Sequence, residues 1–304
     1  MRRSNNKGSA IIIVLIISII AMSLTLFAVG ISKKMVKSSE MLMDKLYAEF
    51  GAESEIEKLK FYISTGRFYS SYVKNDFSNY GFPKILYIDG RRQKIDNATL
   101  HIQDTGGLIN VWVLNKKVIK NILTLDNVTP SKAAIVCDSL EDWYDNDNLR
   151  HLNGAESEYY KLNGYKYAPR NFNGVQSIYE WHMVRGLVDN KTFDTLKKYL
   201  VISPNWHVNV GTMSTTMLSA VFGMPFDFTN TMVQIKKEQG SLTLSDISKV
   251  LGNNVNTSDL SDYPTFVLDI STEFKFNTSM EKVVCTISFR SDNLTPYRIL
   301  KWLN

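Results

Sequence analysis

The stretch MRRSNNKGSAIIIVLIISIIAMSLTLFAVG, residues 1–30, decides the architecture of this chain of 304 residues. From Ser9 to Gly30 it contains 22 residues and no charged side chain. A hydrocarbon core of roughly 30 Å is crossed by about 20 apolar helical residues. The stretch therefore predicts one membrane-spanning helix at residues 9–30.

The apolar run differs from a cleaved secretory signal. It is longer than an ordinary signal-peptide core, and no small-residue cleavage site followed by a turn closes it. Helical spacing continues to about Thr65 without a proline. Positive charges flank both ends of the span, at Arg2, Arg3, Lys7, Lys33, Lys34 and Lys37. The two ends carry nearly equal positive charge, so charge alone does not decide the orientation of the span in the membrane. The large domain behind a short N-terminal tail favours a cytoplasmic N-terminus.

The basic leader of residues 1–8 ends at Gly8, directly before the apolar helix. This pattern is typical of segments cut by prepilin peptidase, with Ser9 as the first mature residue. Ordinary pilins carry Glu at mature position five, and Ile13 stands there in this chain. A carboxylate in the bilayer needs a partner, which in pilin fibres is the amine of the preceding subunit. Ile13 therefore suits a tip subunit without a predecessor; an uncleaved signal anchor is the alternative.

The rest of the chain alternates between two kinds of pattern. The helix behind the span carries a stripe at Leu46, Phe50, Ile56, Leu59 and Ile63 that we expect to face a sheet. Strand-like runs follow near both ends of the domain: ILYID (85–89), ATLHIQD (98–104), TFVLDISTEFKFN (265–277), KVVCTISFRS (282–291) and YRILKWL (297–303).

Short amphipathic segments separated by Gly, Asn and Pro fill the middle of the chain. A sheet built from both ends with helices between them indicates an insertion. We therefore predict an α+β fold in which a pilin-like long N-terminal helix packs on an antiparallel sheet, with a large all-α insertion domain. The expected parts are the leader 1–8, the span 9–30, a first domain part 31–107, the insertion 108–255 and C-terminal strands 256–304.

Composition argues against several other classes. The net charge of +5 is mild, and no dense basic patch favours nucleic acid. The chain lacks the GxSxG, P-loop, GxGxxG and HExxH motifs, so we predict no enzymatic activity. Cys137 and Cys285 are 148 positions apart, and the sequence leaves open whether they pair.

The polar stretch DWYDNDNLRHLNGAESEYY concentrates carboxylates. Asp142, Asp145, Asp147, Glu156 and Glu158 lie within 17 residues. Calcium takes six to eight oxygens, which loop carboxylates and carbonyls supply. The stretch does not fit the EF-hand template. From these residues alone, a solvated acidic loop is the competing interpretation.

Several motifs in a shared order resemble the K-type minor pseudopilins of type II secretion systems. These are the leader ending at Gly8, the missing Glu at Ile13, GAES (51–54), GGLINVWVLN (106–115), DWYDNDN (142–148), GAESEYY (154–160), VQSIYEWHMVRGL (175–187) and HVNVGTM (207–213). Trp112 and Gly211 depart from the Asn expected in two of the motifs. The resemblance covers nearly the whole chain.

That resemblance implies a structural protein at the tip of a periplasmic pseudopilus, anchored in the inner membrane by a single pass. Implied partners are minor pseudopilins of the I and J types, other pseudopilins, the prepilin peptidase that cleaves and methylates the N-terminus, and an exoprotein or the outer-membrane channel. It also implies structural calcium bound by Asp142, Asp145, Asp147 and Glu156, with Glu158 and Asn171 as further ligand candidates. A minor pilin of a type IV pilus or competence system and an unprocessed membrane-anchored binding protein remain alternatives.

Overall fold

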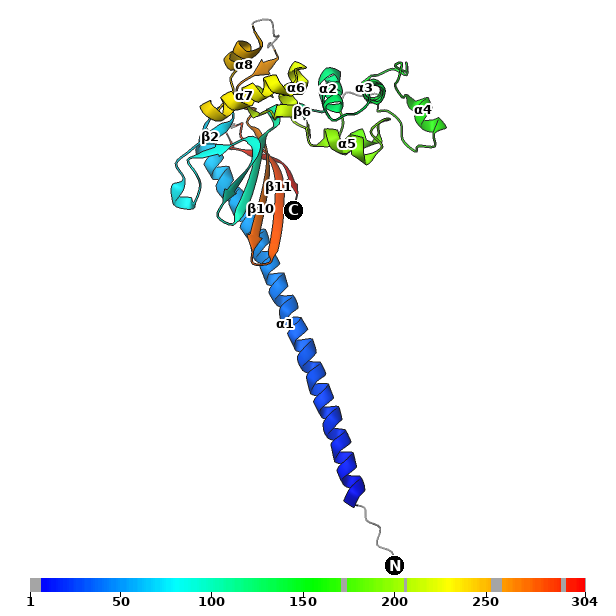
Figure 1. Ribbon diagram of the computed structural model, residues 1–304, viewed down its shortest axis with the longest axis vertical. Helices are drawn as coiled ribbons and strands as arrows, with labels where there is room; N and C mark the ends of the chain where they lie inside the picture. Colours follow the sequence, from blue (N-terminus) through cyan, green and yellow to red (C-terminus); the bar gives the residue numbers. More distant parts are fainter. Residues whose placement is uncertain (1–6, 171–173, 205–206, 253–258, 291–293, 304) are drawn as a thin grey trace, which may run out of the picture.

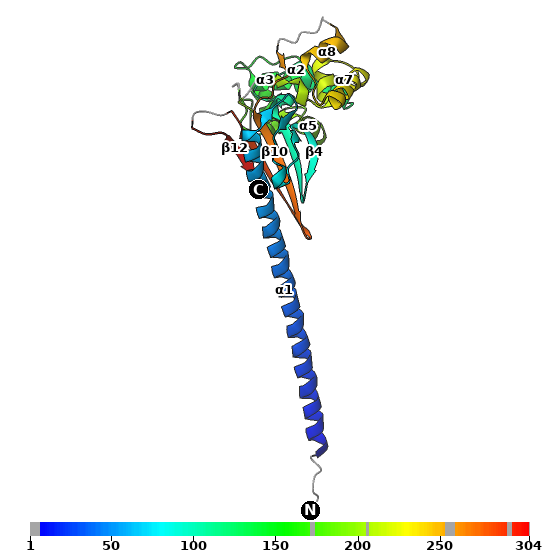
Figure 2. The ribbon, with the colours of Figure 1, turned by 90° about the vertical axis from the view of Figure 1, so that its left-hand side faces the viewer.

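A single long helix organises the molecule. The computed structural model describes residues 7–170, 174–204, 207–252, 259–290 and 294–303, with side chains from Ala10 on. Helix α1 (Lys7–Thr65) projects its first half away from the rest and packs its second half along a sheet (Figures 1 and 2). A helical module lies across the far end of that sheet and extends to one side of the helix axis (Figure 1).

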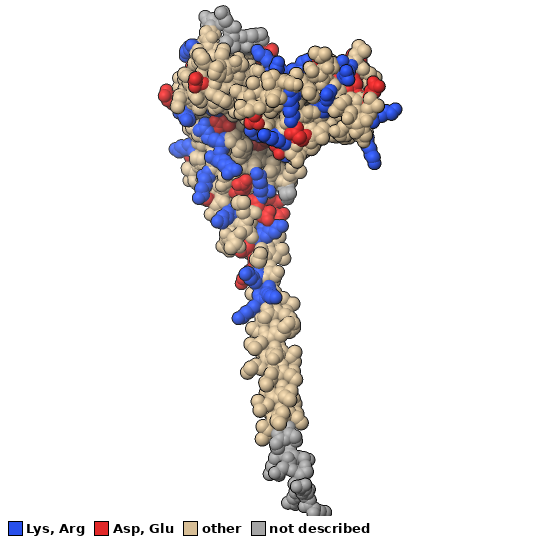
Figure 3. Space-filling view, turned by 45° about the vertical axis from the view of Figure 1, so that its right-hand side comes forward, with Lys and Arg blue, Asp and Glu red and all other residues tan. Residues whose placement is uncertain are grey.

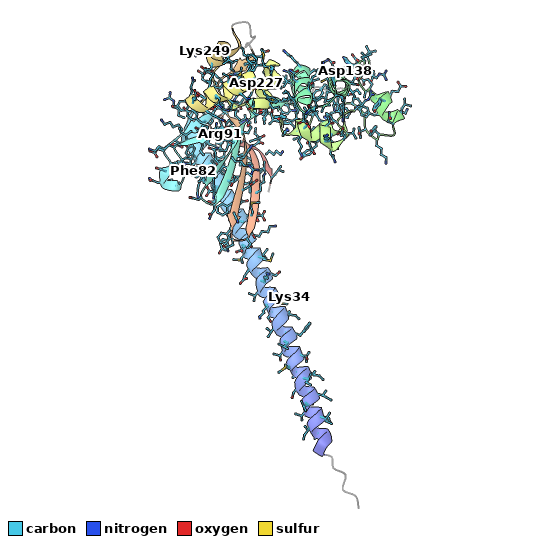
Figure 4. All side chains as sticks on the ribbon, in the orientation of Figure 1. Lys34, Phe82, Arg91, Asp138, Asp227 and Lys249 are labelled. Carbon is cyan, nitrogen blue, oxygen red and sulfur yellow. The ribbon has the colours of Figure 1, made fainter. Side chains whose placement is uncertain are left out.

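The projecting half of α1 has an apolar surface that suits contact with lipid. Its large apolar side chains are exposed, and Figure 3 shows this part free of charge up to a basic group near the domain. Lys34, labelled in Figure 4, lies just past the apolar run. The hydroxyl groups of Ser18, Ser23 and Thr25 each donate to the carbonyl four residues earlier, so they need no water. This helix is a single-pass membrane anchor, and the soluble domain follows it.

Two antiparallel sheets follow the anchor. The larger has the order β12-β11-β10-β5-β4, and a smaller one has the order β1-β2-β3. Their strands are β1 (Arg67–Phe68), β2 (Tyr72–Lys74), β3 (Ile85–Tyr87), β4 (Asp89–Ile95), β5 (Ala98–Asp104), β10 (Val267–Phe276), β11 (Ser279–Ser288) and β12 (Arg298–Leu303). Strands β10 and β11 form the expected hairpin, which closes where Phe276 pairs with Ser279. Every run predicted as a strand contains a strand, and β1, β2 and β4 were not predicted.

The face that α1 turns to the sheet is only partly the predicted stripe. Ile56, Leu59 and Ile63 are fully buried, but Leu46 and Phe50 are exposed, so the prediction was wrong for those two. Small residues take the contact there, because a Cβ on Gly51 would lie 2.3 Å from the ring of Phe274 on β10. Ala48 and Ala52, on either side of this glycine, are fully buried as well.

The middle of the chain forms the helical module. Its helices are α2 (Lys116–Leu125), α3 (Pro130–Tyr144), α4 (Ser157–Leu162), α5 (Asn190–Lys197), α6 (Thr215–Phe222), α7 (Phe226–Gln239) and α8 (Leu244–Leu251). The module region also carries the 3₁₀ turns η2 (Thr105–Gly107), η3 (Ile178–Met183) and η4 (Val210–Thr212), and the two-residue strands β6 (Ile109–Asn110), β7 (Leu200–Val201), β8 (Val208–Asn209) and β9 (Leu260–Ser261). The insertion is therefore not wholly α-helical, and VQSIYEWHMVRGL contains a 3₁₀ turn instead of an α-helix.

Each part has its own buried cluster. One joins α1 to the larger sheet, and the other fills the module around Trp143 and Trp181. Cys285 is buried in the first cluster and Cys137 in the second, and both thiols are free. The open question about a disulfide is therefore answered: the two cysteines do not pair. The exact domain limits given above stay a prediction.

A buried carboxylate joins the two parts. Asp104 ends β5 and is completely buried. It accepts hydrogen bonds from the amide and hydroxyl of Thr265, from the amide of Gly106 at 3.3 Å and from Asn209 Nδ2 at 2.7 Å. Burial raises the pKa of Asp104, and these donors offset part of that rise. GGLIN and HVNVGTM, two motifs distant in sequence, therefore meet at one side chain.

A second polar link ties β4 to α7. Lys236 Nζ lies 2.8 Å from Asp89 Oδ2, and both side chains are buried. Arg91 donates to the same carboxylate and stacks over the ring of Tyr87 (Arg91 is labelled in Figure 4). Burial would raise the pKa of Asp89, but the two cations outweigh it and hold the pKa below its usual value. The ion pair between Lys236 and Asp89 thus joins the module to the sheet domain, in addition to the chain connections.

Candidate metal centre

The acidic stretch lies at the outer end of the module. Helix α3 begins at a Thr129 cap followed by Pro130, which is preorganised for a first helical turn. Its apolar side packs on the module core and carries Asp142 into the interior in the last turn of the helix. The loop 145–156 then returns towards α3 before α4 begins. Both the helix and the returning loop therefore present carboxylates to the same place.

The structure brings the four predicted ligands together in two overlapping groups. Ligand atoms of Asp145, Asp147 and Glu156 all lie within 4.8 Å of one another, and the same holds for Asp142, Asp145 and His151. Asp145 belongs to both groups. Asp142 is fully buried and Glu156 is nearly so. Proximity of this kind without compensation is costly, since like charges repel most strongly away from water.

Four of these carboxylate oxygens are buried and have no hydrogen-bond partner among the described residues. They are Asp142 Oδ2, Asp145 Oδ1, Glu156 Oε1 and Glu156 Oε2. A buried, unsatisfied charged oxygen costs more than the roughly 1–3 kcal/mol of a neutral polar group. A bound cation would satisfy all four. The donor set, all oxygen and all from loop or helix-end carboxylates, fits a hard divalent ion.

The loop is held in place by contacts outside the carboxylate group. Asp138 Oδ2 accepts from the amide of Asn153 at 3.1 Å and from its Nδ2 at 2.9 Å (Asp138 is labelled in Figure 4). Arg185 Nη1 donates to the carbonyl oxygens of Asn153 and Gly154, at 3.2 and 2.8 Å. A Cβ on Gly154 would lie 2.0 Å from Asp142 Oδ2, so only glycine lets the loop pass this close. The carboxylates are thus positioned by the fold itself.

Burial and the neighbouring negative charges raise the pKa of two carboxyl groups in this cluster. Burial raises the pKa of Glu156 to about 7, and the charges of Asp142 and Asp145 add to the rise. Burial also raises the pKa of Asp145, with Asp147 and Asp142 contributing. Without a cation, therefore, the folded state holds protons that the unfolded chain would release.

This proton binding predicts how the metal-free protein responds to pH. Glu156 titrates near 4.5 when unperturbed and near 7 when folded, so its stabilising contribution below pH 4.5 is lost as pH rises through about 7. We expect the melting temperature of the full chain in chelator and detergent to fall between about pH 5 and pH 8. In a Glu156→Gln variant the fall should be smaller, and an equal fall in both proteins would contradict the assignment.

His151 is the member of the centre that the sequence interpretation missed. Its Nδ1 lies 2.5 Å from Asp142 Oδ1, and its Nε2 lies 3.1 Å from Glu141 Oε2. The signal was its position midway between DWYDNDN and GAE in the same loop. Of the two further ligand candidates, Glu158 is exposed on α4 and belongs to neither group, and Asn171 lies outside the described residues.

The predicted processing site lies at the start of α1. Gly8 and Ser9 are in its first turn, and residues 1–6 of the leader lie outside the described residues. Ile13, five residues into the predicted mature chain, is 57% exposed on the anchor. From Ala10 on, α1 is long and apolar enough to cross a membrane.

The chain is similar to a known protein family and to a solved structure. The family model described as type II secretion system protein K matches residues 103–205, which contain the whole carboxylate centre. The fold resembles that of a chain in the crystal structure of the GspK–GspI–GspJ complex from the enterotoxigenic Escherichia coli type 2 secretion system. The TM-score is 0.56 at 14% identity, over 88% of this chain and 98% of that chain. No curated protein matches the chain. A membrane-anchored pilin-like domain carrying a helical insertion, together with a family match over the first part of that insertion, supports the predicted resemblance of this chain to the protein K minor pseudopilins of type II secretion systems.

Proposed function

We propose that this chain is the non-enzymatic tip subunit of a type II secretion pseudopilus. The observation that carries the proposal is the position of the helical module. It lies across the end of the pilin-like domain that is remote from the anchor and overhangs the helix axis (Figures 1 and 2). A further subunit stacked above would have to occupy the space that the module fills. The module therefore suits a cap.

Ile13 supports the same position. In the interior of a fibre, a mature-position-five carboxylate is neutralised by the N-terminal amine of a neighbouring subunit, and an unpaired carboxylate in lipid is costly. An isoleucine needs no neighbour. The first subunit of a fibre is the one that has no predecessor to supply that amine.

The proposed setting follows from the anchor and the cap. The span crosses the inner membrane once, with the C-terminal bulk in the periplasm. Minor pseudopilins of the I and J types are the proposed partners beside the anchor, and prepilin peptidase is the enzyme that removes residues 1–8. The exposed module is the part available to an exoprotein or to the outer-membrane channel. Under this proposal the chain makes and breaks no bond.

Calcium is the proposed ligand of the carboxylate centre. Asp142, Asp145, Asp147 and Glu156 would supply the charged oxygens, with loop carbonyls completing the shell. The four unpartnered oxygens support this assignment. The ion would neutralise the cluster and join the end of α3 to the start of α4, so its role is structural.

Processing separates the proposal from an unprocessed membrane-anchored binding protein. We expect the protein extracted from membranes to begin at Ser9, and a Gly8→Leu variant to keep its leader, because leucine would replace the glycine that defines the predicted cleavage point. Intact-mass analysis of both proteins measures this. An intact Met1 in the unaltered protein would rule out the pilin class.

Location along the fibre tests the cap itself. Gold-labelled antibody against the helical module should mark one end of each isolated pseudopilus. Labelling along the fibre length would contradict a tip position. Absence from pseudopili, with labelling of a type IV pilus instead, would favour the alternative of a minor pilin.

A further inference from the structure

A cavity of about 450 Å³ lies beside the segments through which the chain enters and leaves the helical module. Its walls come from the start of α2, from α6 and from the paired strands β8 and β9, and α2 and α6 lie side by side (Figure 1). The residues of the carboxylate centre are not among those described as lining it. The cavity is therefore a separate feature, which the function proposed above does not use.

The wall of this cavity is largely apolar. Val118 on α2, Met213 in front of α6 and Met217 on α6 are buried, and Val221 and Leu260 are half-buried. Methionine side chains are unbranched and adapt to an occupant of irregular shape. An apolar occupant would remove this surface from water, which is favourable in proportion to the area covered.

The polar side chains of the wall are already bonded within the chain. Thr105 Oγ1 lies 3.1 Å from Ser203 Oγ, and Asn110 Nδ2 donates to the carbonyl oxygen of Ser203 at 2.7 Å. Asn115 Oδ1 accepts from the amide of Val118 at 3.1 Å. Sites for polar ligands offer a few convergent polar groups that fix the ligand. Because these groups are engaged elsewhere, the interior suits a hydrocarbon chain better than a sugar, a nucleotide or a peptide backbone.

The ionisable groups of the lining are exposed. They are Lys117, His207 and Asp259. Asp259 already has an interaction within the chain, whereas Lys117 belongs to no ion pair among the described residues. An anionic head group next to Lys117 would complement its charge while staying in water. The cavity thus combines an apolar interior with a cation at its rim.

The volume limits what can fill the interior. An apolar cavity of about 150 Å³ holds one benzene ring, so one of about 450 Å³ holds roughly 12–18 carbon atoms. One apolar side chain of a partner protein would leave much of this space empty, and an empty space forfeits contacts along every wall. The two acyl chains of a phospholipid exceed it. A single acyl chain fits best.

We propose that this cavity binds a long-chain carboxylate, a free fatty acid, with its chain between α2 and α6 and its carboxylate beside Lys117. The site depends neither on the calcium centre nor on the position of the chain in a pseudopilus.

Methyl NMR of the full chain tests the proposal, with dodecanoate as the probe. Protein labelled at its methionine methyl groups is prepared in a steroid-based detergent, because an alkyl detergent would compete for the cavity. We expect dodecanoate to shift the signals of Met213 and Met217 and to leave that of Met280, which is 63% exposed on β11, in place. Met213→Leu and Met217→Leu assign the two signals, since this exchange nearly conserves volume.

Variants test the head group and the chain separately. Lys117→Glu should weaken dodecanoate binding about tenfold, because it replaces an attraction at the rim by a repulsion. Neutral dodecanol should bind this variant and the unaltered protein alike. The control Lys120→Glu alters an exposed lysine of α2 that is not among the lining residues, and it should bind dodecanoate normally. Val221→Trp fills the cavity, so neither ligand should shift the Met217 signal.

Three results would overturn the proposal. The first is the absence of any dodecanoate-dependent shift at Met213 and Met217, or an equal shift at Met280. The second is equal dodecanoate binding by Lys117→Glu and Lys120→Glu. The third is a shift of the same two signals by added partner pseudopilins but not by dodecanoate, since the occupant would then be a protein segment.

Discussion

We expect an Asp104→Ala variant to lose about 3–5 kcal/mol of the free energy of unfolding. The substitution leaves the amides of Gly106 and Thr265 and the Nδ2 group of Asn209 without their acceptor in a buried place. Each donor left unsatisfied costs about 1–3 kcal/mol, and entry of water offsets only part of the sum. The loss should appear in the sheet and in the module together, because the donors come from both.

Thermal melting of the full chain in detergent measures this effect. Asp194, exposed on α5, provides the matched control, and Asp194→Ala should leave the melting temperature nearly unchanged. An Asp104→Asn variant keeps the shape of the side chain but replaces one acceptor oxygen with an amide group, which is itself a donor. We therefore expect it to recover little of the stability that Asp104→Ala loses. An Asp104→Ala protein as stable as the control would show that the junction does not depend on this carboxylate.

Calcium should raise the melting temperature of the chelated protein by about 5–10 °C. A ligand present at a hundred times its dissociation constant stabilises the folded state by about 2.7 kcal/mol, and a domain of this size gains a few degrees per kcal/mol. The shift should be larger near pH 8 than near pH 5, since a proton occupies Glu156 at the lower pH. Melting curves with and without chelator, at both pH values, measure it.

Variants and metal analysis complete the calcium test. Asp147→Asn and Glu156→Gln should each remove most of the calcium-induced shift, whereas Asp194→Asn should keep it. Asp147 lies in the group with Asp145 and Glu156 and not in the group that contains His151. An unchanged melting temperature in chelator, together with no bound metal in the purified protein, would falsify the calcium proposal.

The fold was largely predictable because its main signals are local. An uncharged apolar run is a membrane helix by composition, and period-two alternation marked ATLHIQD as a strand before its partners were known. Where the prediction was wrong, tertiary contacts decided. Leu46 and Phe50 have helical spacing that suits burial, yet Gly51 and its small neighbours face β10, and the two large side chains are left outside.

The candidate centre was predictable in part for a similar reason. Four carboxylates in one short stretch give a compositional signal, and the structure places all four together. His151 gave only its position between the two acidic motifs, which is a weak signal, because a histidine in a loop is ordinary until Glu141 and Asp142 are seen on either side of its ring. Asp104 was missed as well, since its partners Asn209 and Thr265 lie more than a hundred positions away along the chain.

The pairing of β5 with β10 has a consequence for how the chain folds. Asp104 pairs with Leu268, so the two strands are neighbours in an antiparallel hairpin whose connection is residues 105–267. Closing so long a connection by a disordered chain costs about 2–3 kcal/mol more than closing a ten-residue loop. A folded module removes that cost, because the hydrogen bond between Asp104 and Thr265 then holds its entry and exit side by side. The module thus acts as the turn of the hairpin, and the central pair of the sheet is completed most readily after the module has folded.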